Sequence, residues 1–152
     1  MSKYIHKLTA EAALEVASNL LPEDRKEVEE GHGHDPKIVI PLASKTGDSV
    51  YFKVPNGEIA GAAGVSKKGQ IWMLCTPAIL KYPHTFARES KRYVESRKEK
   101  LLWNVVDKRN GVHLKLLRFL GFKFLRELPY GPNNLSFIEF CRVRASINND
   151  GN

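Results

Sequence analysis

The sequence predicts an α+β fold, placed with three-layer α/β folds in some classifications, in which helices flank a mixed, mostly antiparallel central sheet. Three observations predict it. Three apolar segments separated by tight turns form a meander between residues 49 and 76. Strand and helix patterns alternate only in the middle of the chain, which argues against a doubly wound parallel sheet. The chain then ends with two further apolar segments joined by a turn rich in Gly, Pro and Asn.

The N-terminal third contains one predicted strand followed by helices. Tyr4–Leu8 is a short first strand, and Thr9 then caps a helix whose alanines and leucines recur at helical spacing. Glu23–Glu30 continues as a helix, and the polar stretch GHGHD after it reads as a surface loop. Ile38–Leu42 is predicted as a short edge segment of the sheet, limited by Pro36 and Pro41.

The meander has the clearest turn signals. Ser49–Val54 is rich in β-branched and aromatic residues and predicts a strand. Pro55-Asn56-Gly57 predicts a hairpin turn, because proline fixes φ and Asn-Gly accepts positive φ. Glu58–Val65 returns as the second strand, and Lys67-Lys68-Gly69 makes the next turn. Gln70–Thr76 is a continuous apolar run, which predicts a strand buried on both faces.

The second half predicts helix, strand, helix and two strands. Tyr82–Lys100 is a long charged helix, Leu101–Val106 is an apolar strand, and Arg109–Leu120 is an amphipathic helix. Gly121 ends that helix as a C-cap. Two final strands are joined by the turn PYGPNN: Phe122–Leu128 and Phe137–Val143.

Length and composition predict one domain. The chain has 152 residues, 42% apolar and 27% charged, so we expect a single domain over residues 1–145 and a flexible polar tail over 146–152. The start of the chain lacks the layout of a signal peptide, and no apolar stretch reaches the roughly 18 residues of a membrane span. Cys75 and Cys141 lie in apolar runs typical of reduced thiols. These features predict a cytoplasmic protein that does not enter a membrane.

The charge is strongly basic, with 24 Lys and Arg against 17 Asp and Glu. Most of the excess lies between Lys81 and Arg126, where it could attract the phosphates of nucleic acid or of a nucleotide cofactor, or form a solvated helix face. No signature of a nucleic-acid-binding module accompanies it, so we do not expect nucleic acid as the partner.

Two stretches match a known family. In Gly57–Pro77 a Gly-rich strand turns back into an apolar strand, and Trp103–Phe122 runs from a strand through Asn to a helix ending in Gly-Phe. Asn110 and Gly121 stand eleven positions apart, as in that family, and Leu116 falls at the position of the family's buried leucine. In these features and in its element order the chain resembles the GNAT N-acetyltransferases.

A narrower resemblance rests on fewer residues. Leu102–Asn104, Asn110, His113 and Leu117 before Gly121 resemble a small GNAT-like family of short-tailed bacteriophages that includes an internal virion or virion-assembly protein. This resemblance implies a phage-encoded protein, located in the host cytoplasm or the virion, with phage or host protein partners.

The GNAT resemblance implies acetyl-CoA as cofactor and an amine of a protein or small molecule as acceptor. In the family the pantetheine arm bonds to the backbone of the fourth strand, and the pyrophosphate lies at the N-terminus of the following helix. Carried onto this sequence, the resemblance implies these cofactor-binding residues: Met73, Leu74, Cys75, Thr76, Lys81, His84, Thr85, Arg88 and Asn110.

The sequence departs from the family in three places. No glycine lies between Ala78 and Lys91, where the family has its Gly-rich pyrophosphate loop. Leu117 stands where the family has a tyrosine acid, and the predicted fourth strand carries no carboxylate. His113 and Glu58 therefore become the catalytic candidates, with Glu58 reaching across from the third strand. Two function classes stay open: an acetyl-CoA-dependent N-acetyltransferase, and a catalytically silent GNAT-fold protein that acts by binding.

Other candidates carry weaker signals. Asn110 is typical of a helix cap as well as of a ligand contact, and the buried amide of Asn104 either bonds across the sheet or faces a substrate. His32, His34 and Asp35 lack a fourth metal ligand, so we expect a solvated loop and no metal site.

Overall fold

Two antiparallel sheets that meet at one edge form the centre of the molecule. We describe a computed structural model of the chain over residues 2–46 and 48–144; the predicted tail at 146–152 lies outside these residues. The first sheet contains β1 (Ile5–Lys7), β2 (Ser49–Lys53), β3 (Ile59–Val65) and β4 (Ile71–Cys75) in that order. The second has the order β5 (Leu101–Asp107), β7 (Leu135–Val143), β6 (Lys123–Tyr130).

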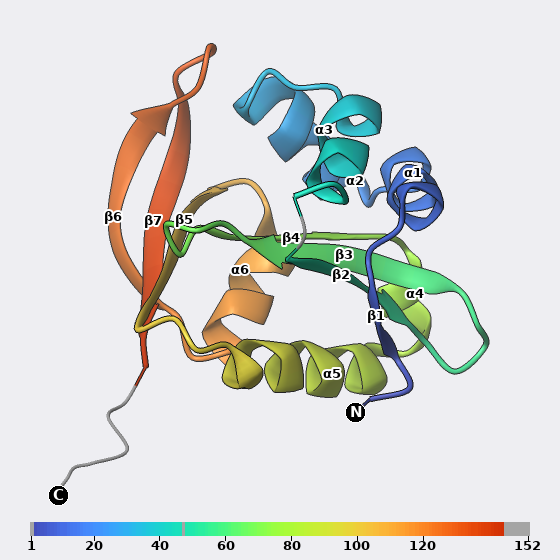
Figure 1. The fold of residues 1–152 in the computed structure, drawn as a ribbon. Coiled ribbons are helices and arrows are strands. Elements are labelled where there is room, and N and C mark those ends of the chain that lie inside the picture. Colours follow the sequence, from blue (N-terminus) through green and yellow to red (C-terminus); the bar gives the residue numbers. More distant parts are fainter. Residues whose placement is uncertain (1, 47, 145–152) are drawn as a thin grey trace, which may run out of the picture.

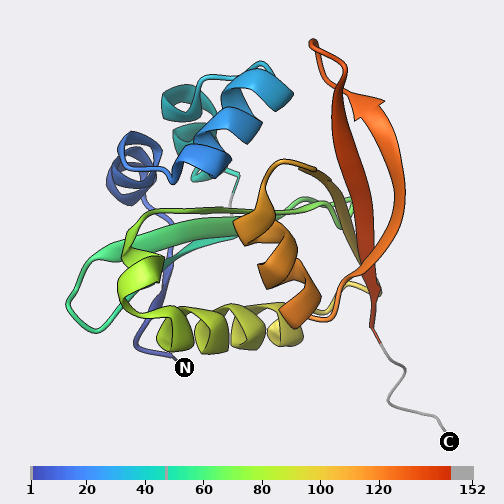
Figure 2. The ribbon, with the colours of Figure 1, turned by 180° about the vertical axis from the view of Figure 1, so that it is seen from behind.

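Helices cover both faces of the first sheet (Figures 1 and 2). On one face lie α1 (Ala10–Ser18), α2 (Pro22–Lys26), the π-helical turn η1 (Glu27–Gly31) and α3 (Pro36–Ala43). On the other lie the short α4 (Ala78–Lys81), α5 (Pro83–Ser96) and α6 (Gly111–Phe119). The larger hydrophobic core fills the space between the sheet and α5 and α6, and a smaller one lies beneath α1 and α3. The predicted α+β class, with a mostly antiparallel sheet flanked by helices, is confirmed.

The local signals in the meander and at the helix ends are also confirmed. The side chain of Thr9 accepts a hydrogen bond from the N–H of Ala12 at 3.1 Å, so Thr9 caps α1. Gly121 has φ +89°, the left-handed conformation that a glycine C-cap supplies. Gly64 is needed for packing, because a Cβ there would meet the indole ring of Trp72.

The prediction of an edge strand at Ile38–Leu42 is wrong, since these residues lie in α3. The capping signals at its start outweigh the β-branched composition. Asp35 accepts the N–H of Lys37 at 3.0 Å, and Pro36 occupies the first turn, where its missing N–H costs nothing. The second proline, Pro41, lies near the end of this short helix and removes only one hydrogen bond.

The long charged helix is shorter than predicted. It ends at Ser96, because the backbone of Arg97 is extended and its guanidinium binds Asp48 at 2.7 Å and Glu99 at 2.6 Å. The stretch before it forms the separate helix α4, which the sequence did not predict. No helix among the described residues is long and apolar enough to cross a membrane.

Candidate functional site

A cavity of about 330 Å³ lies between β4 and β5. The two sheets are joined here by a single parallel bridge between Gln70 and Trp103, where the N–H of Trp103 donates to the carbonyl of Gly69 at 3.0 Å. Beyond this bridge the strands diverge, and the cavity opens between them. Side chains of η1, α3 and α6 complete its walls.

The backbone of β4 is engaged at both ends of the cavity. Alternation in the antiparallel ladder with β3 turns the N–H and C=O groups of Ile71, Met73 and Cys75 away from β3. Asn104 donates through Nδ2 to the carbonyl of Ile71 at 2.7 Å, a bond across the divergence, which is the first of the two alternatives expected for this amide. At the other end the N–H of Cys75 donates to Oδ2 of Asp24 at 2.7 Å, and its carbonyl accepts the N–H of Leu21 at 2.9 Å.

Met73 is thus the central residue of β4 whose backbone faces the cavity. Leu74 is paired with Ala62 of β3, and its side chain lines the cavity. The N–H of Thr76 donates to the carbonyl of Ala60 and its hydroxyl to the carbonyl of Ile59. Of the four residues implied as cofactor contacts in β4 and directly after it, Met73 therefore has the backbone position that suits an extended ligand.

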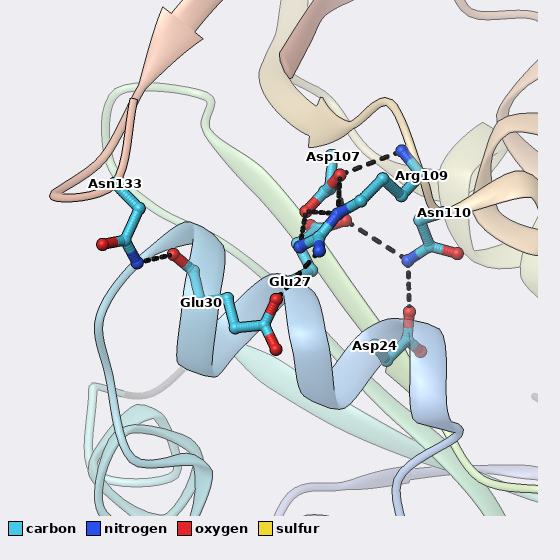
Figure 3. Close-up of polar contacts among 7 residues, drawn as sticks. All are labelled: Asp24, Glu27, Glu30, Asp107, Arg109, Asn110 and Asn133. Carbon is cyan, nitrogen blue, oxygen red and sulfur yellow. Dashed lines mark hydrogen bonds and ion pairs between the residues drawn. The ribbon is translucent and has the colours of Figure 1, made fainter. Parts of the chain in front are cut away.

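A buried polar network forms one end of the cavity (Figure 3). Asn110 caps α6 by accepting the N–H of His113 at 3.1 Å. Its Nδ2 donates to Oδ1 of Asp24 at 2.7 Å and to Oε1 of Glu27 at 3.2 Å. The N–H of Asp107 also donates to Oε1 of Glu27, at 3.1 Å. Both bonds to Glu27 are accepted by one oxygen, Oε1, and Glu27 is among the residues that line the cavity.

The surroundings of this network shift two pKa values. Burial raises the pKa of Glu27 to about 7, and the nearby charge of His113 offsets part of that rise. Burial alone would lower the pKa of His113, but the carboxylates of Asp24 and Glu27 outweigh it, so the pKa is raised. Nδ1 of His113 lies 3.7 Å from Oδ1 of Asp24, which makes this contact electrostatic rather than a close hydrogen bond.

The structure brings His113 to the cavity and keeps Glu58 away from it. Glu58 lies after the β2–β3 turn, where it binds Nζ of Lys81 at 2.9 Å and Nδ2 of Asn56 at 2.5 Å. Leu117, at the position of the family's tyrosine, is buried in the larger core and lines the cavity. Among the sequence candidates for proton transfer, His113 alone lies where a reacting group could meet it.

The expected phosphate end lies at α4 and α5. In place of a Gly-rich loop, α4 uses backbone N–H groups within its own turn: Ile79 donates to Thr76 and Leu80 to Pro77. Lys81 is paired with Glu58, and Arg88 is paired with the buried Glu89 at 3.1 Å. His84 and Thr85 lie in the first turn of α5, next to Pro83.

Sequence reasoning missed the acidic half of the network. The sequence predicts Glu23–Glu30 only as a helix followed by a surface loop, yet Asp24 in this helix is only 2% exposed. One signal could have found it: Asp24 shares a helix face with the apolar residues Leu21 and Val28, at spacings of three and four residues. A carboxylate on an apolar face needs buried donors, and Asn110 and the N–H of Cys75 supply them.

His32 and His34 line the cavity without forming a metal centre. The His32 ring stacks on His34 at 5.8 Å and makes edge contacts with Tyr130 at 5.2 Å and Phe137 at 5.5 Å. Across residues 2–46 and 48–144, no three His, Cys, Asp or Glu side chains converge as metal ligands.

No protein-family model and no curated protein sequence matches the chain. Its structure, however, is similar to solved GNAT acetyltransferases. A GNAT-family acetyltransferase from Bacillus anthracis superposes with a TM-score of 0.67 at 12% identity, covering 91% of this chain and 93% of that one. Ribosomal-protein-alanine N-acetyltransferase from Brucella melitensis gives 0.65 at 13% identity, with coverage of 92% and 99%. Aminoglycoside acetyltransferase AAC(6')-Ib in complex with coenzyme A gives 0.61 at 15% identity, with coverage of 93% and 94%. These similarities establish the GNAT fold.

Proposed function

We propose that the protein transfers an acetyl group from acetyl-CoA to an amine in the cavity between β4 and β5. The observation that carries this proposal is that Glu27 and His113 both line the cavity, together with the residues of β4. A carboxylate with a pKa of about 7 can accept a proton at neutral pH, as acetylation of an ammonium group requires. The neighbour crystallised with coenzyme A supports the choice of donor.

The residues around the cavity suit the two ends of such a donor unequally. Met73 offers a backbone N–H and C=O to the pantetheine arm, and the apolar side chains of α6 face it. At the phosphate end, the N–H groups of the first turn of α5 and the side chains of His84 and Arg88 would hold the phosphates. When bound, acetyl-CoA supplies the thioester carbonyl that the amine attacks and the thiolate that leaves.

Glu27 and His113 divide the proton transfers between them. Glu27, held through Oε1, takes the proton of the incoming ammonium on Oε2. His113 faces Asp24 through Nδ1, so Nε2 is the atom that holds or delivers a proton at the cavity. In this assignment His113 supplies the acid that Leu117 cannot, and Glu27 replaces Glu58 as the base.

A second candidate function is supported by the phosphate end. Its cations are engaged in ion pairs, glycines are absent from 78 to 91, and a leucine replaces the tyrosine. These features suit a catalytically silent GNAT-fold protein that binds another protein, as in phage virion assembly or host-protein binding.

Calorimetric titration with acetyl-CoA and with CoA tests the first proposal against the second. Micromolar binding, about −8 kcal/mol, is expected for the enzyme. Val105→Trp would fill the cavity and abolish binding, whereas Val143→Trp, at an exposed position on β7, would leave it intact. Neither heat nor a thermal shift at millimolar cofactor would rule out the acetyltransferase and favour the binding protein.

A further inference from the structure

One side of the cavity is closed by a set of contacts that we call the clasp, between residues 30–33 and residues 130–133. Nδ2 of Asn133 donates to the carbonyl of Glu30 at 2.9 Å. The backbone of Gly131 lies directly against the carbonyl of Gly31, and the ring of Pro132 lies against Gly33. Figure 3 shows Asn133 reaching from the β6–β7 turn to η1.

The clasp connects the two walls of the cavity. His32 and Tyr130 both line the cavity, one from each wall, and their rings meet edge to face at 5.2 Å. Behind the clasp, Arg109 binds Glu30 at 2.8 Å and Asp107 at 2.8 Å, which ties η1 to the end of β5. The helical wall and the sheet wall therefore touch on the side of the cavity next to Glu27.

This contact sets the width available to an acceptor. A polypeptide segment crossing the cavity on this side would have to separate the two backbones at Gly31 and Gly131, break the Asn133 bond and part the rings of His32 and Tyr130. A compact amine needs none of these changes, because it can enter beside the clasp, where His34 and Val39 line the cavity and are accessible.

The charge of the same wall suits a cation. Between Pro22 and Asp35 the chain has six Asp and Glu residues against two basic residues, although the whole protein carries a net charge of +7. This local negative charge attracts ammonium groups. Glu27 belongs to this acidic segment and lines the cavity, and both of its hydrogen bonds in the network are accepted by Oε1.

We propose that the acceptor is a compact small-molecule amine, and that the clasp excludes amines held within an extended polypeptide. This inference rests on the acetyltransferase proposed above. Lysine side chains within peptides should therefore be poor acceptors, and opening the clasp should raise the rate at which they are acetylated.

The test compares two classes of acceptor by thiol release from acetyl-CoA. A panel of compact amines (1,4-diaminobutane, benzylamine and spermidine) is compared with a twelve-residue peptide carrying one central lysine. The best amine is expected to exceed the peptide in kcat/KM by about 100-fold. Asn133→Ala should narrow this gap about tenfold, a change of about 1.4 kcal/mol. Asn19→Ala is the matched control, because its exposed amide also donates to a backbone carbonyl, that of Glu15, at 2.8 Å.

Hydrogen exchange gives a readout independent of turnover. The N–H groups of His32 and His34 donate to the carbonyls of Glu27 and Val28, so they should exchange slowly in the wild type, faster in Asn133→Ala and unchanged in Asn19→Ala. Unprotected amides in the wild type would show an open clasp and overturn the proposal. So would equal turnover of peptide and amines, or turnover of no panel amine by a protein that binds acetyl-CoA. Absence of acetyl-CoA binding would instead refute the acetyltransferase itself.

Discussion

Two regions of the molecule are built in different ways. At the cavity, Asp24, Asp107, Asn110 and His113 are buried and linked by hydrogen bonds, directly or through Glu27. Around α4 and the start of α5, Lys81 and Glu58 form an exposed pair at 2.9 Å, and Arg88 is also exposed. Truncating one partner of a buried hydrogen bond leaves the other partner unsatisfied and is costly, whereas exposed ion pairs contribute little to stability. The buried network is therefore integral to the fold, while the exposed side chains of α4 and α5 can vary with little cost to folding.

The largest expected effect is at Asn110. Asn110→Ala removes the cap of α6 and the donor to Asp24 and Glu27, so we expect a loss of about 3 kcal/mol in the free energy of unfolding. In the β2–β3 turn, Asn56→Ala removes an exposed asparagine that bonds to Glu58, and the free energy of unfolding should fall by less than about 1 kcal/mol. Urea unfolding of both variants measures the contrast. Equal losses would show that the network is no more important to the fold than a surface turn.

The second effect concerns the base. Glu27→Gln keeps an Oε1 acceptor but loses the carboxylate, so we expect kcat to fall by about 100-fold or more. In the wild type kcat/KM should rise with pH through about 7, as Glu27 loses its proton, and the variant should lack this inflection. Glu29→Gln, two residues later on the exposed side of η1, is the control. An unchanged pH profile in Glu27→Gln would assign the base elsewhere.

The same titration affects stability in the opposite direction. Between the ordinary pKa of 4.5 and the raised pKa of about 7, the folded state keeps the Glu27 proton and the unfolded state releases it. The contribution of Glu27 to the free energy of unfolding is therefore fully present below pH 4.5 and is lost as pH rises through its folded-state pKa of about 7. The raised pKa of His113 acts in the same sense, because its stabilising charge is lost at higher pH. In Glu27→Gln the free energy of unfolding, measured by urea unfolding at several pH values, should fall less steeply between pH 4.5 and 7.

The third effect distinguishes the cost of a steric contact at Gly131 of the clasp from the cost of positive φ alone, as at Gly57. Gly131 and Gly57 both have positive φ, but a Cβ at Gly131 would meet the carbonyl of Gly31, whereas nothing lies within 4 Å of Gly57. Gly57→Ala should cost about 1 kcal/mol for the backbone conformation alone. Gly131→Ala should cost at least about 1 kcal/mol more, or should open the clasp and speed exchange at His32. Identical unfolding curves for the two variants would show that the hairpin does not press on η1.

The sequence predicted the fold better than it predicted the site. The turn at Asn56-Gly57, the cap at Thr9 and the positive φ of Gly121 follow from local chemistry and are confirmed. The edge segment predicted at Ile38–Leu42 is instead part of a helix, because Asp35 and Pro36 form the start of α3. Both kinds of information lie within a few residues of chain, so local reasoning can reach them.

The buried polar network around Glu27 could not be predicted from local sequence. Glu27 and Asp107 are 80 positions apart, and Asp24 and Asn110 are 86 apart, so their contacts depend on how η1 packs against the end of β5. Glu58 was chosen as base from its strand alone, and only the three-dimensional arrangement shows that Lys81 and Asn56 hold it at the surface. For Asn104 the sequence predicted two alternatives, a bond across the divergence or a substrate contact. The structure shows the bond to the facing strand.

The smallest expected effect tests whether the ion pair between Lys81 and Glu58 weakens CoA binding. Glu58→Ala releases Lys81, so CoA should bind about two- to fivefold more tightly, with little change in the melting temperature. Glu127→Ala is the matched control, because it breaks a similar exposed pair with Lys108 at 3.2 Å on the other sheet. Calorimetry of both variants decides between the two functions. Tighter binding in Glu58→Ala alone would place the phosphates at Lys81, since only a cation near the ligand can sense the loss of its partner. If neither variant binds CoA, the cations of α4 and α5 serve the fold or a protein partner, and the cavity is the remnant of a donor site.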